Sequence, residues 1–143
     1  MTIPTWLHPE EIPDVAVLDE DECWSLLEAE TTGRLGVRTT EGVDIFPVNF
    51  QVTDRAIFLR SAPGSKLRDI SRESQVAFEI DAHHGPHFWS VVVHGVAERM
   101  AFDDDIQASS VLELATLTSS AKWNYIRIAP SDISGRRFST LGT

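Results

Sequence analysis

From residue 34 onward, apolar and polar residues alternate along most of the chain, and this period of two is typical of β-strands with one buried face. Short turn signals separate the first three of these segments, at Glu41–Gly42 and at Thr53–Arg55. This spacing predicts an antiparallel meander joined by hairpins. The strands that we expect are Arg34–Thr39, Val43–Val52 with an interruption at Pro47, Ala56–Ser61, Gln75–Asp81, Phe88–Met100, Trp123–Ile128 and a short Ile133–Ser139.

Three segments have helical patterns instead. Asp19 is a good N-cap and Glu22, three residues later, completes a capping box, so the sequence predicts a first helix that ends near Gly33. Further helices are expected over Ser65–Glu73 and Ile106–Leu117. Many strands with a few helices at their connections predict a mainly β fold, a small closed barrel with peripheral helices.

The prolines, glycines and histidines between the expected elements indicate the domain bounds and the irregular segments. Residues 1–17 contain three prolines, which exclude a regular helix and predict an extended N-terminal arm before a single domain at residues 18–143. The segment His83–His87 is expected to be a loop. Gly95, in the middle of a long strand, is expected to be a bulge or a point of close approach.

Composition excludes several classes of protein. The formal charge of −10 argues against nucleic acid or an anionic membrane as a main partner. Cys23 is the only cysteine, so no internal disulfide can form, and a reducing cytoplasm is the expected location. The first 14 residues have neither the basic start nor the apolar core of a signal peptide, and they do not read as a membrane span.

The segment Phe58–Leu67, FLRSAPGSKL, is typical of a phosphate-binding joint between a strand and a helix. Arg60 and Ser61 end the strand, and Ser65 and Lys66 begin the helix after a Pro–Gly turn. Helix N-termini attract anions, so a lysine in the first turn is electrostatically misplaced unless an anion lies beside it. The alternative is an ordinary joint whose basic side chains point into solvent.

Six motifs in order then indicate a family. They are TTGRLGV (31–37), FPVNF (46–50), FLRSAPGSKL (58–67), VAFEID (76–81), WSVVVHGVA (89–97) and ISGRRF (133–138). Together they resemble the pyridoxamine 5′-phosphate oxidase-like family of FMN-binding split β-barrels, over about residues 18–138. The resemblance implies a six-stranded antiparallel split barrel of Greek-key type that works as a homodimer, with two flavins in grooves at the subunit interface.

Residue by residue, the resemblance implies a site for FMN. Arg60, Ser61, Ser65 and Lys66 would hold the phosphate. The segment Pro47, Val48 and Asn49 would run alongside the isoalloxazine ring and donate hydrogen bonds to its polar edge. Trp89 and Ser90 would contact the cofactor. In one arrangement of the homodimer, the second subunit would supply them.

The implied activity is that of an oxidoreductase on a small molecule, because a flavin performs hydride or electron transfer itself. Members that act on vitamin B6 phosphate carry an Arg-x-His pattern, whereas Arg127 is followed here by Ala129, so we do not expect that substrate. Two alternatives stay open on the same fold: a deazaflavin-dependent reductase, and a non-catalytic module that binds flavin or haem. The cations of Gly135–Arg137 either approach a cofactor tail or form surface or interface salt bridges.

Other candidate sites have simpler interpretations. We expect His83, His84 and His87 to lie in a solvated loop and not at a metal, and His94 to be hydrogen-bonded within the sheet unless it faces a groove. Cys23 is expected to be a buried apolar residue and not a reactive thiol. The run Asp103–Asp105 is expected to cap a helix.

Overall fold

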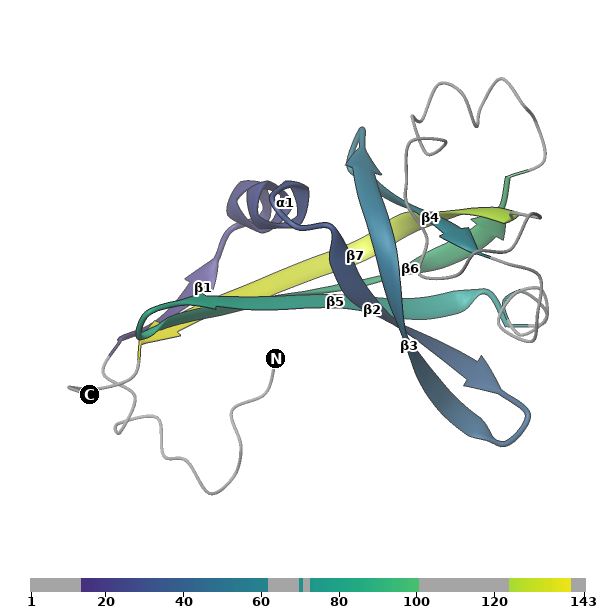
Figure 1. Cartoon of the computed structure of the whole chain (residues 1–143), viewed down its shortest axis with the longest axis horizontal. Helices are drawn as coiled ribbons and strands as arrows, with labels where there is room; N and C mark the ends of the chain where they lie inside the picture. Colours follow the sequence, from purple (N-terminus) through teal and green to yellow (C-terminus); the bar gives the residue numbers. More distant parts are fainter. Residues whose placement is uncertain (1–13, 62–69, 71–72, 101–123, 140–143) are drawn as a thin grey trace.

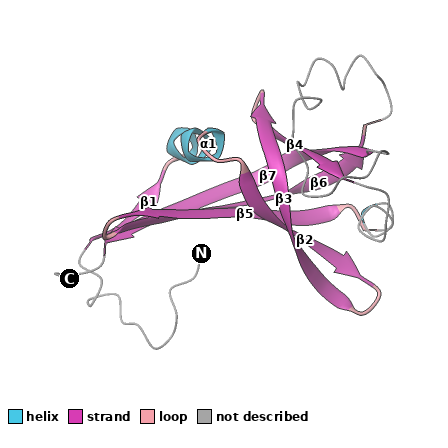
Figure 2. Cartoon of the chain, viewed as in Figure 1, coloured by secondary structure: helices cyan, strands magenta, loops and turns pink. Residues whose placement is uncertain are grey.

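The computed structural model describes residues 14–61, 70, 73–100 and 124–139, and these ranges form seven strands and one helix (Figures 1 and 2). In chain order the elements are β1 (Asp14–Leu18), α1 (Glu20–Glu28), β2 (Thr32–Thr39), β3 (Gly42–Thr53), β4 (Ala56–Ser61), β5 (Gln75–His84), β6 (His87–Arg99) and β7 (Asn124–Ser139).

Six strands close into a ring in which every neighbouring pair is antiparallel. The order is β7–β4–β3–β2–β5–β6, and β6 pairs with β7 to close it. The seventh strand, β1, pairs with the second half of β7. The predicted six-stranded split barrel is therefore confirmed, with one additional strand at its edge.

The strand β3 belongs to two ladders in succession. Its first eight residues pair with β2, and its last four, Phe50–Thr53, pair with β4. Pro47 lies before the ladder with β4 begins, where a residue without an N–H group is tolerated at a strand edge. The predicted interruption at Pro47 is thus wrong, because the strand runs through it without a break.

The barrel interior holds the core, and α1 packs against it. The helix buries Cys23, Trp24 and Leu27 against the strands. Inside the barrel the rings of Phe50 and Phe78 meet edge to face, with centroids 4.8 Å apart. Fully burying side chains of this size stabilises a fold by roughly 1.5–3 kcal/mol each, so this core is the main source of stability.

The helix α1 begins where the sequence predicts and ends earlier. The Oδ1 atom of Asp19 accepts a hydrogen bond from the Glu22 backbone N–H at 2.8 Å, which confirms Asp19 as the N-cap. The prediction that the helix extends nearly to Gly33 is wrong, because α1 ends at Glu28 and Gly33 lies in β2. At Gly33 the Phe78 ring packs so closely that a Cβ atom would lie 2.4 Å from its Cζ.

Two further boundaries differ from the predictions. The expected loop His83–His87 is a hairpin whose only turn residues are Gly85 and Pro86, with Gly85 at a φ of 59°. Glycine is favoured at the first position of such two-residue turns. The two expected strands at the C-terminal end are one continuous strand, β7, of 16 residues.

The expectation for Gly95 is confirmed. The pairing of β6 with β7 shifts register between His94 and Gly95, and a Cβ atom at Gly95 would lie 2.4 Å from the Ala129 carbonyl oxygen. This close approach explains why the strand carries a glycine there.

Several predictions fall partly outside the described residues. Of the helix expected at Ser65–Glu73, only Ile70 and Glu73 belong to the described residues. The helix expected at Ile106–Leu117 and the expected cap Asp103–Asp105 lie entirely outside them. The expected arm at residues 1–17 is described from Asp14 onward, where it forms β1 of the sheet. In the described part of the chain, no helix has both the length and the apolar character that a membrane span requires.

The two glycines of β2 give a matched test of this packing. Gly33→Ala places a methyl group against the buried Phe78 ring and the Glu79 carbonyl, so we expect a loss of about 1–3 kcal/mol in the free energy of unfolding. Gly36→Ala is the control, since its new Cβ atom would meet nothing closer than the Ala77 carbonyl oxygen at 3.7 Å. Urea denaturation measures both variants, and equal midpoints would contradict the packing described for Gly33.

Candidate functional site

The predicted phosphate-binding strand and the predicted ring-binding strand lie side by side. Phe50 of β3 pairs with Leu59 of β4, so Asn49 and Arg60 occupy neighbouring positions on the two strands. Arg60 is partly buried. Ser61 follows it at the end of β4, opposite Asn124. Ser65 and Lys66 continue from this end but lie outside the described residues.

The three residues predicted to run alongside a flavin ring offer different groups. The side chain of Val48 is buried in the core, so Val48 can offer only its backbone. Pro47 is exposed and has no N–H to donate. The side-chain oxygen of Asn49 accepts a hydrogen bond from the Thr32 hydroxyl at 3.1 Å, which fixes the orientation of the amide. A polar ring edge at this position would therefore be recognised mainly by Asn49.

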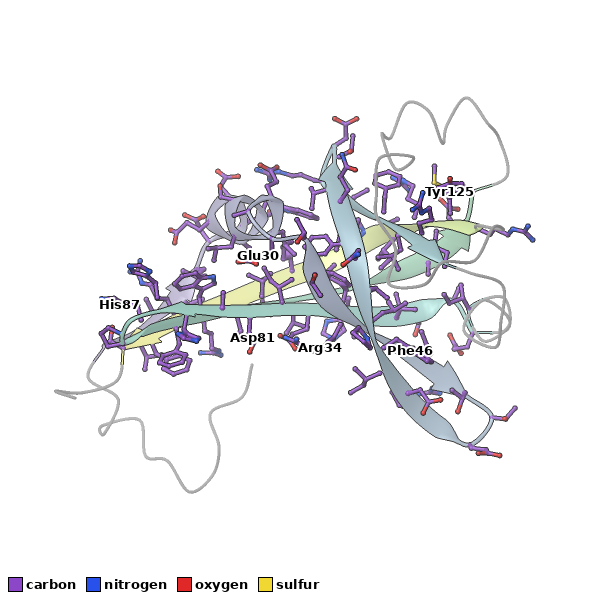
Figure 3. All side chains as sticks on the ribbon, in the orientation of Figure 1. Glu30, Arg34, Phe46, Asp81, His87 and Tyr125 are labelled. Atoms are coloured by element: carbon purple, nitrogen blue, oxygen red, sulfur yellow. The ribbon has the colours of Figure 1, made fainter. Side chains whose placement is uncertain are left out.

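Trp89 and Ser90 lie far from this group within one protomer. Arg60 pairs with Tyr125 near the start of β7, whereas Trp89 pairs with Arg137 near its end. Twelve residues of extended strand separate Tyr125 from Arg137, or roughly 40 Å. Figure 3 labels both regions, with Tyr125 at one end of the sheet and His87, next to this corner, at the other. One flavin cannot contact both groups on a single chain.

Strand alternation also separates Trp89 from Ser90. Trp89 lines a groove of about 470 Å³ next to α1, together with Arg137. Ser90 is buried on the opposite face, where it pairs with Asp81 and Arg136. The indole Nε1 of Trp89 is buried and has no hydrogen-bond partner among the described residues. The structure therefore directs these two neighbours to different surroundings.

We call the side of the sheet opposite α1 the outer face. Residues paired directly across antiparallel strands point to the same face, so the registers define which side chains share it. A row across this face is Pro47, Arg34, Glu79 and Val92. The core residues Leu35 and Phe78, one position along, point the other way. The outer face thus includes the Pro47 end of the predicted flavin site.

A charged cluster lies at the centre of the outer face, and the sequence reasoning missed it. Arg34 donates two hydrogen bonds to the Glu79 carboxylate, at 2.6 and 2.9 Å, and a third to Asp81. The hydrogen bonds to Glu79, and then to Asp81, raise the pKa of the Arg34 guanidinium, although burial acts the other way. Figure 3 shows Arg34 and Asp81 side by side below the sheet, with α1 above it.

A signal for this cluster was present in the sequence. Arg34 lies in the motif TTGRLGV, and Glu79 and Asp81 alternate with core residues in VAFEID. The alternation predicts that both carboxylates share one face, but only the register of β2 against β5 brings Arg34 opposite Glu79.

Apolar side chains surround this cluster on the same face. Val17 pairs with Arg136, and Ile45 pairs with Gly36, so both point to the outer face. Val17 is 75% exposed and Ile45 is 68% exposed. Every large apolar side chain that is exposed in the described residues points to this face: Val15, Val17, Val43, Ile45 and Val96. The hairpin of β2 and β3, which carries two of them, projects from the body of the sheet (Figure 1).

The basic residues near the end of β7 divide between the faces. Arg136 points to the outer face beside Ser90, and Arg137 lines the groove next to α1. Arg127, the residue that resembles part of the Arg-x-His pattern, donates to Glu98 at 3.2 Å. Ala129, which stands at the position of the pattern's histidine, packs its carbonyl oxygen against Gly95.

The other candidate residues have structural partners. His83 stacks on Phe88, and His87 bonds to the Ser139 hydroxyl at 2.9 Å. His94 bonds through Nδ1 to Asp132 at 2.8 Å. Within the described ranges, no three His, Cys, Asp or Glu side chains are grouped so that they could hold a metal ion.

Cys23 is fully buried, as predicted. Burial, followed by the nearby carboxylates Asp19, Glu22 and Glu20, raises the pKa of the Cys23 thiol. A thiol that stays protonated is a poor nucleophile, so Cys23 is not a candidate for a reactive thiol.

Comparison with known proteins adds to this geometry. Residues 19–137 match the model of the pyridoxamine 5′-phosphate oxidase family. A crystal structure from Corynebacterium glutamicum, provisionally named pyridoxamine 5′-phosphate oxidase, is 40% identical, with a TM-score of 0.80 over 88% of this chain and 99% of that one.

Two solved relatives are described as binding FAD. The protein of Mycobacterium smegmatis is 35% identical, with a TM-score of 0.74 over 87% of this chain and 98% of that one. The protein of Mesorhizobium loti is 27% identical, with a TM-score of 0.79 over 87% of this chain and 97% of that one. The match to the family model covers most of the chain, and the chain therefore belongs to the pyridoxamine 5′-phosphate oxidase family.

Proposed function

We propose that this protein binds FMN between two copies of the chain and acts as an oxidoreductase on a small molecule. The observation that carries the proposal is the adjacency of Arg60 and Asn49 at the end of β4, directly before the segment that contains Ser65 and Lys66. A guanidinium and an amide at one strand end suit a phosphate and the polar edge of a planar ring. Both FAD-binding relatives support a flavin at this fold.

The positions of Trp89 and Ser90 favour a second copy. They lie roughly 40 Å along β7 from the strand end that carries Arg60, so they can take part in the same site only if a partner chain supplies them. The exposed valines and the isoleucine of the outer face provide a surface for that partner, because soluble monomers rarely leave a large apolar patch in water.

In this proposal the chain binds the flavin, orients its ring and shields it from water. A bound flavin supplies the hydride or electron transfer chemistry. Arg60, with Lys66 from the following segment, holds the phosphate by charge. Asn49, fixed by Thr32, orients the ring, and a partner chain over the outer face excludes water from it. No acid–base pair is needed from the protein for these roles.

Removal of the predicted phosphate contact gives the first test. Lys66→Ala is expected to weaken FMN binding by about 1.5–3 kcal/mol, the value of a charge-assisted hydrogen bond. Titration of the flavin-free protein with FMN, followed by flavin fluorescence, measures the dissociation constant. Arg55→Ala is the control, because Arg55 lies in the turn between β3 and β4 and pairs with Asp21 on the surface.

An unchanged dissociation constant for Lys66→Ala would remove Lys66 from the site. The spectrum and mass of the ligand that copurifies give a second readout. A band near ~450 nm that bleaches on reduction, with the mass of FMN, is the expected result, since the absorbance belongs to the cofactor itself. The mass of FAD, a deazaflavin or haem would contradict FMN, and failure of any reductant to consume bound flavin would indicate a carrier.

The partner chain is tested through the outer face. We expect sedimentation to give a dimer at micromolar concentration, and Val17→Asp and Ile45→Asp each to shift the mass toward the monomer, because a buried unpaired carboxylate is costly. Thr40→Asp, in the exposed turn between β2 and β3, is the matched control and should leave the dimer intact. A monomeric wild-type protein, or dimers unaffected by both substitutions, would reject this interface.

A further inference from the structure

A second groove crosses the outer face, and none of its lining residues is among those proposed above to contact the flavin. Its volume is about 460 Å³, within the range of small-molecule pockets, and strands β2, β5 and β6 form its floor. Gly36 and Ala77 pair directly across β2 and β5, and His94 pairs with Ala77 on the other side. The floor is therefore flat, because the methyl group of Ala77 is the largest side chain of this Gly36–Ala77 pair.

The barrel itself does not require a glycine at position 36. A Cβ atom at Gly33, Gly95 or Gly135 would collide with neighbours at 2.4 to 2.7 Å, so packing explains those residues. A Cβ atom at Gly36 would have ordinary contacts, the nearest at 3.7 Å. Glycine within a strand costs roughly 0.5–1 kcal/mol relative to alanine and often marks the close approach of another group. Gly36 keeps the floor of the groove open.

One cationic side chain at the groove, Arg38, points to an anionic ligand. Arg38 lines the groove and makes no ion pair within the part of the chain that the structure describes. His94 lines the opposite wall, and its Nδ1 is held by Asp132 at 2.8 Å, which leaves Nε2 as the second polar atom of the ring. Glu73 is the acidic residue on the rim, and its carboxylate accepts the Gln75 N–H at 3.3 Å.

The backbone beside His94 is fixed as well. The register shift between His94 and Gly95 is a bulge, a feature that often directs a side chain toward a site. The Ser131 hydroxyl donates to the His94 carbonyl oxygen at 3.0 Å. Val43 and Val96 add apolar walls, 68% and 43% exposed respectively.

We propose that this groove binds a small, flat organic anion, with an aromatic carboxylate as the representative ligand. The apolar ring would lie over Gly36 and Ala77 between Val43 and Val96. The carboxylate would accept hydrogen bonds from Arg38 at one side of the groove, and the His94 ring would form part of the opposite wall.

The location of the groove also assigns a role to its ligand. Ile45, which pairs with Gly36, is two residues from Pro47, so the groove begins about 7 Å from the edge where a flavin ring is proposed. The ligand would then be the substrate beside that ring. This role rests on the proposed function, whereas the binding of an anion in the groove does not.

The test compares benzoate with benzamide, which have the same shape and differ in charge. Each is titrated into the purified, isotope-labelled protein, with and without bound flavin, and amide chemical shifts are recorded. We expect shifts at Gly36, Ala77 and Val96 and at least about tenfold tighter binding of benzoate, as for a hydrogen bond to a charged group. Arg38→Gln should abolish the preference, and Gly36→Val should block both probes.

Arg55→Gln is the control for the loss of a positive charge. If Gly36→Val does not fold, Gly36→Ala replaces it as a variant that fills less of the groove. Equal affinities for the two probes, shifts outside the groove or an unchanged preference in Arg38→Gln would each overturn the proposal. The proposal would also be overturned if neither probe bound the wild-type protein and Gly36→Val changed the sedimentation mass. That result would show that a second copy of the chain fills the groove. Benzoate binding to protein that takes up no flavin would keep the groove and reject only its role beside the cofactor.

Discussion

The pairing of β7 with strands on both of its sides is the constraint on which the rest of the structure depends. Its first part pairs with β4 and its last part with β1, while β6 follows almost the whole strand on the other edge. The strand thereby closes the ring of six strands and also adds β1 at its edge. Gly95 makes this closure possible, because only a residue without a side chain lets the Ala129 backbone approach so closely.

The length of that strand determines how the proposed flavin site can be assembled. The strand end that carries Arg60 and the corner that carries Trp89 are each well defined, but they are fixed at opposite ends of the same sheet. A rigid barrel cannot bring them together by bending, since its interior is closely packed around Phe50 and Phe78. A two-fold arrangement of two chains is the simple way to place one end against the other.

The outer face combines two features that are uncommon on a free surface. Exposed valines and an isoleucine lie around a central cluster in which one arginine serves two carboxylates. Apolar area drives association, and fixed charge pairs give it register. The open floor at Gly36 lies on this same face, so association, cofactor and groove would share one surface.

The sequence by itself determined the strand pattern, the N-cap at Asp19, the bulge at Gly95 and the burial of Cys23, because each follows from local periodicity or from the conformational limits of one residue type. It placed Arg60 and Asn49 correctly in their strands, and the predicted hairpin at Thr53–Arg55 made those strands neighbours, but only the register of Phe50 against Leu59 shows that the two residues occupy adjacent positions. Tertiary structure alone decided the end of α1 at Glu28, the contact of the Phe78 ring with Gly33, and the union of the last two strands into β7. It also decided which side chains share the outer face. Register between strands far apart in the chain depends on the packing of the whole barrel, and no local pattern encodes it.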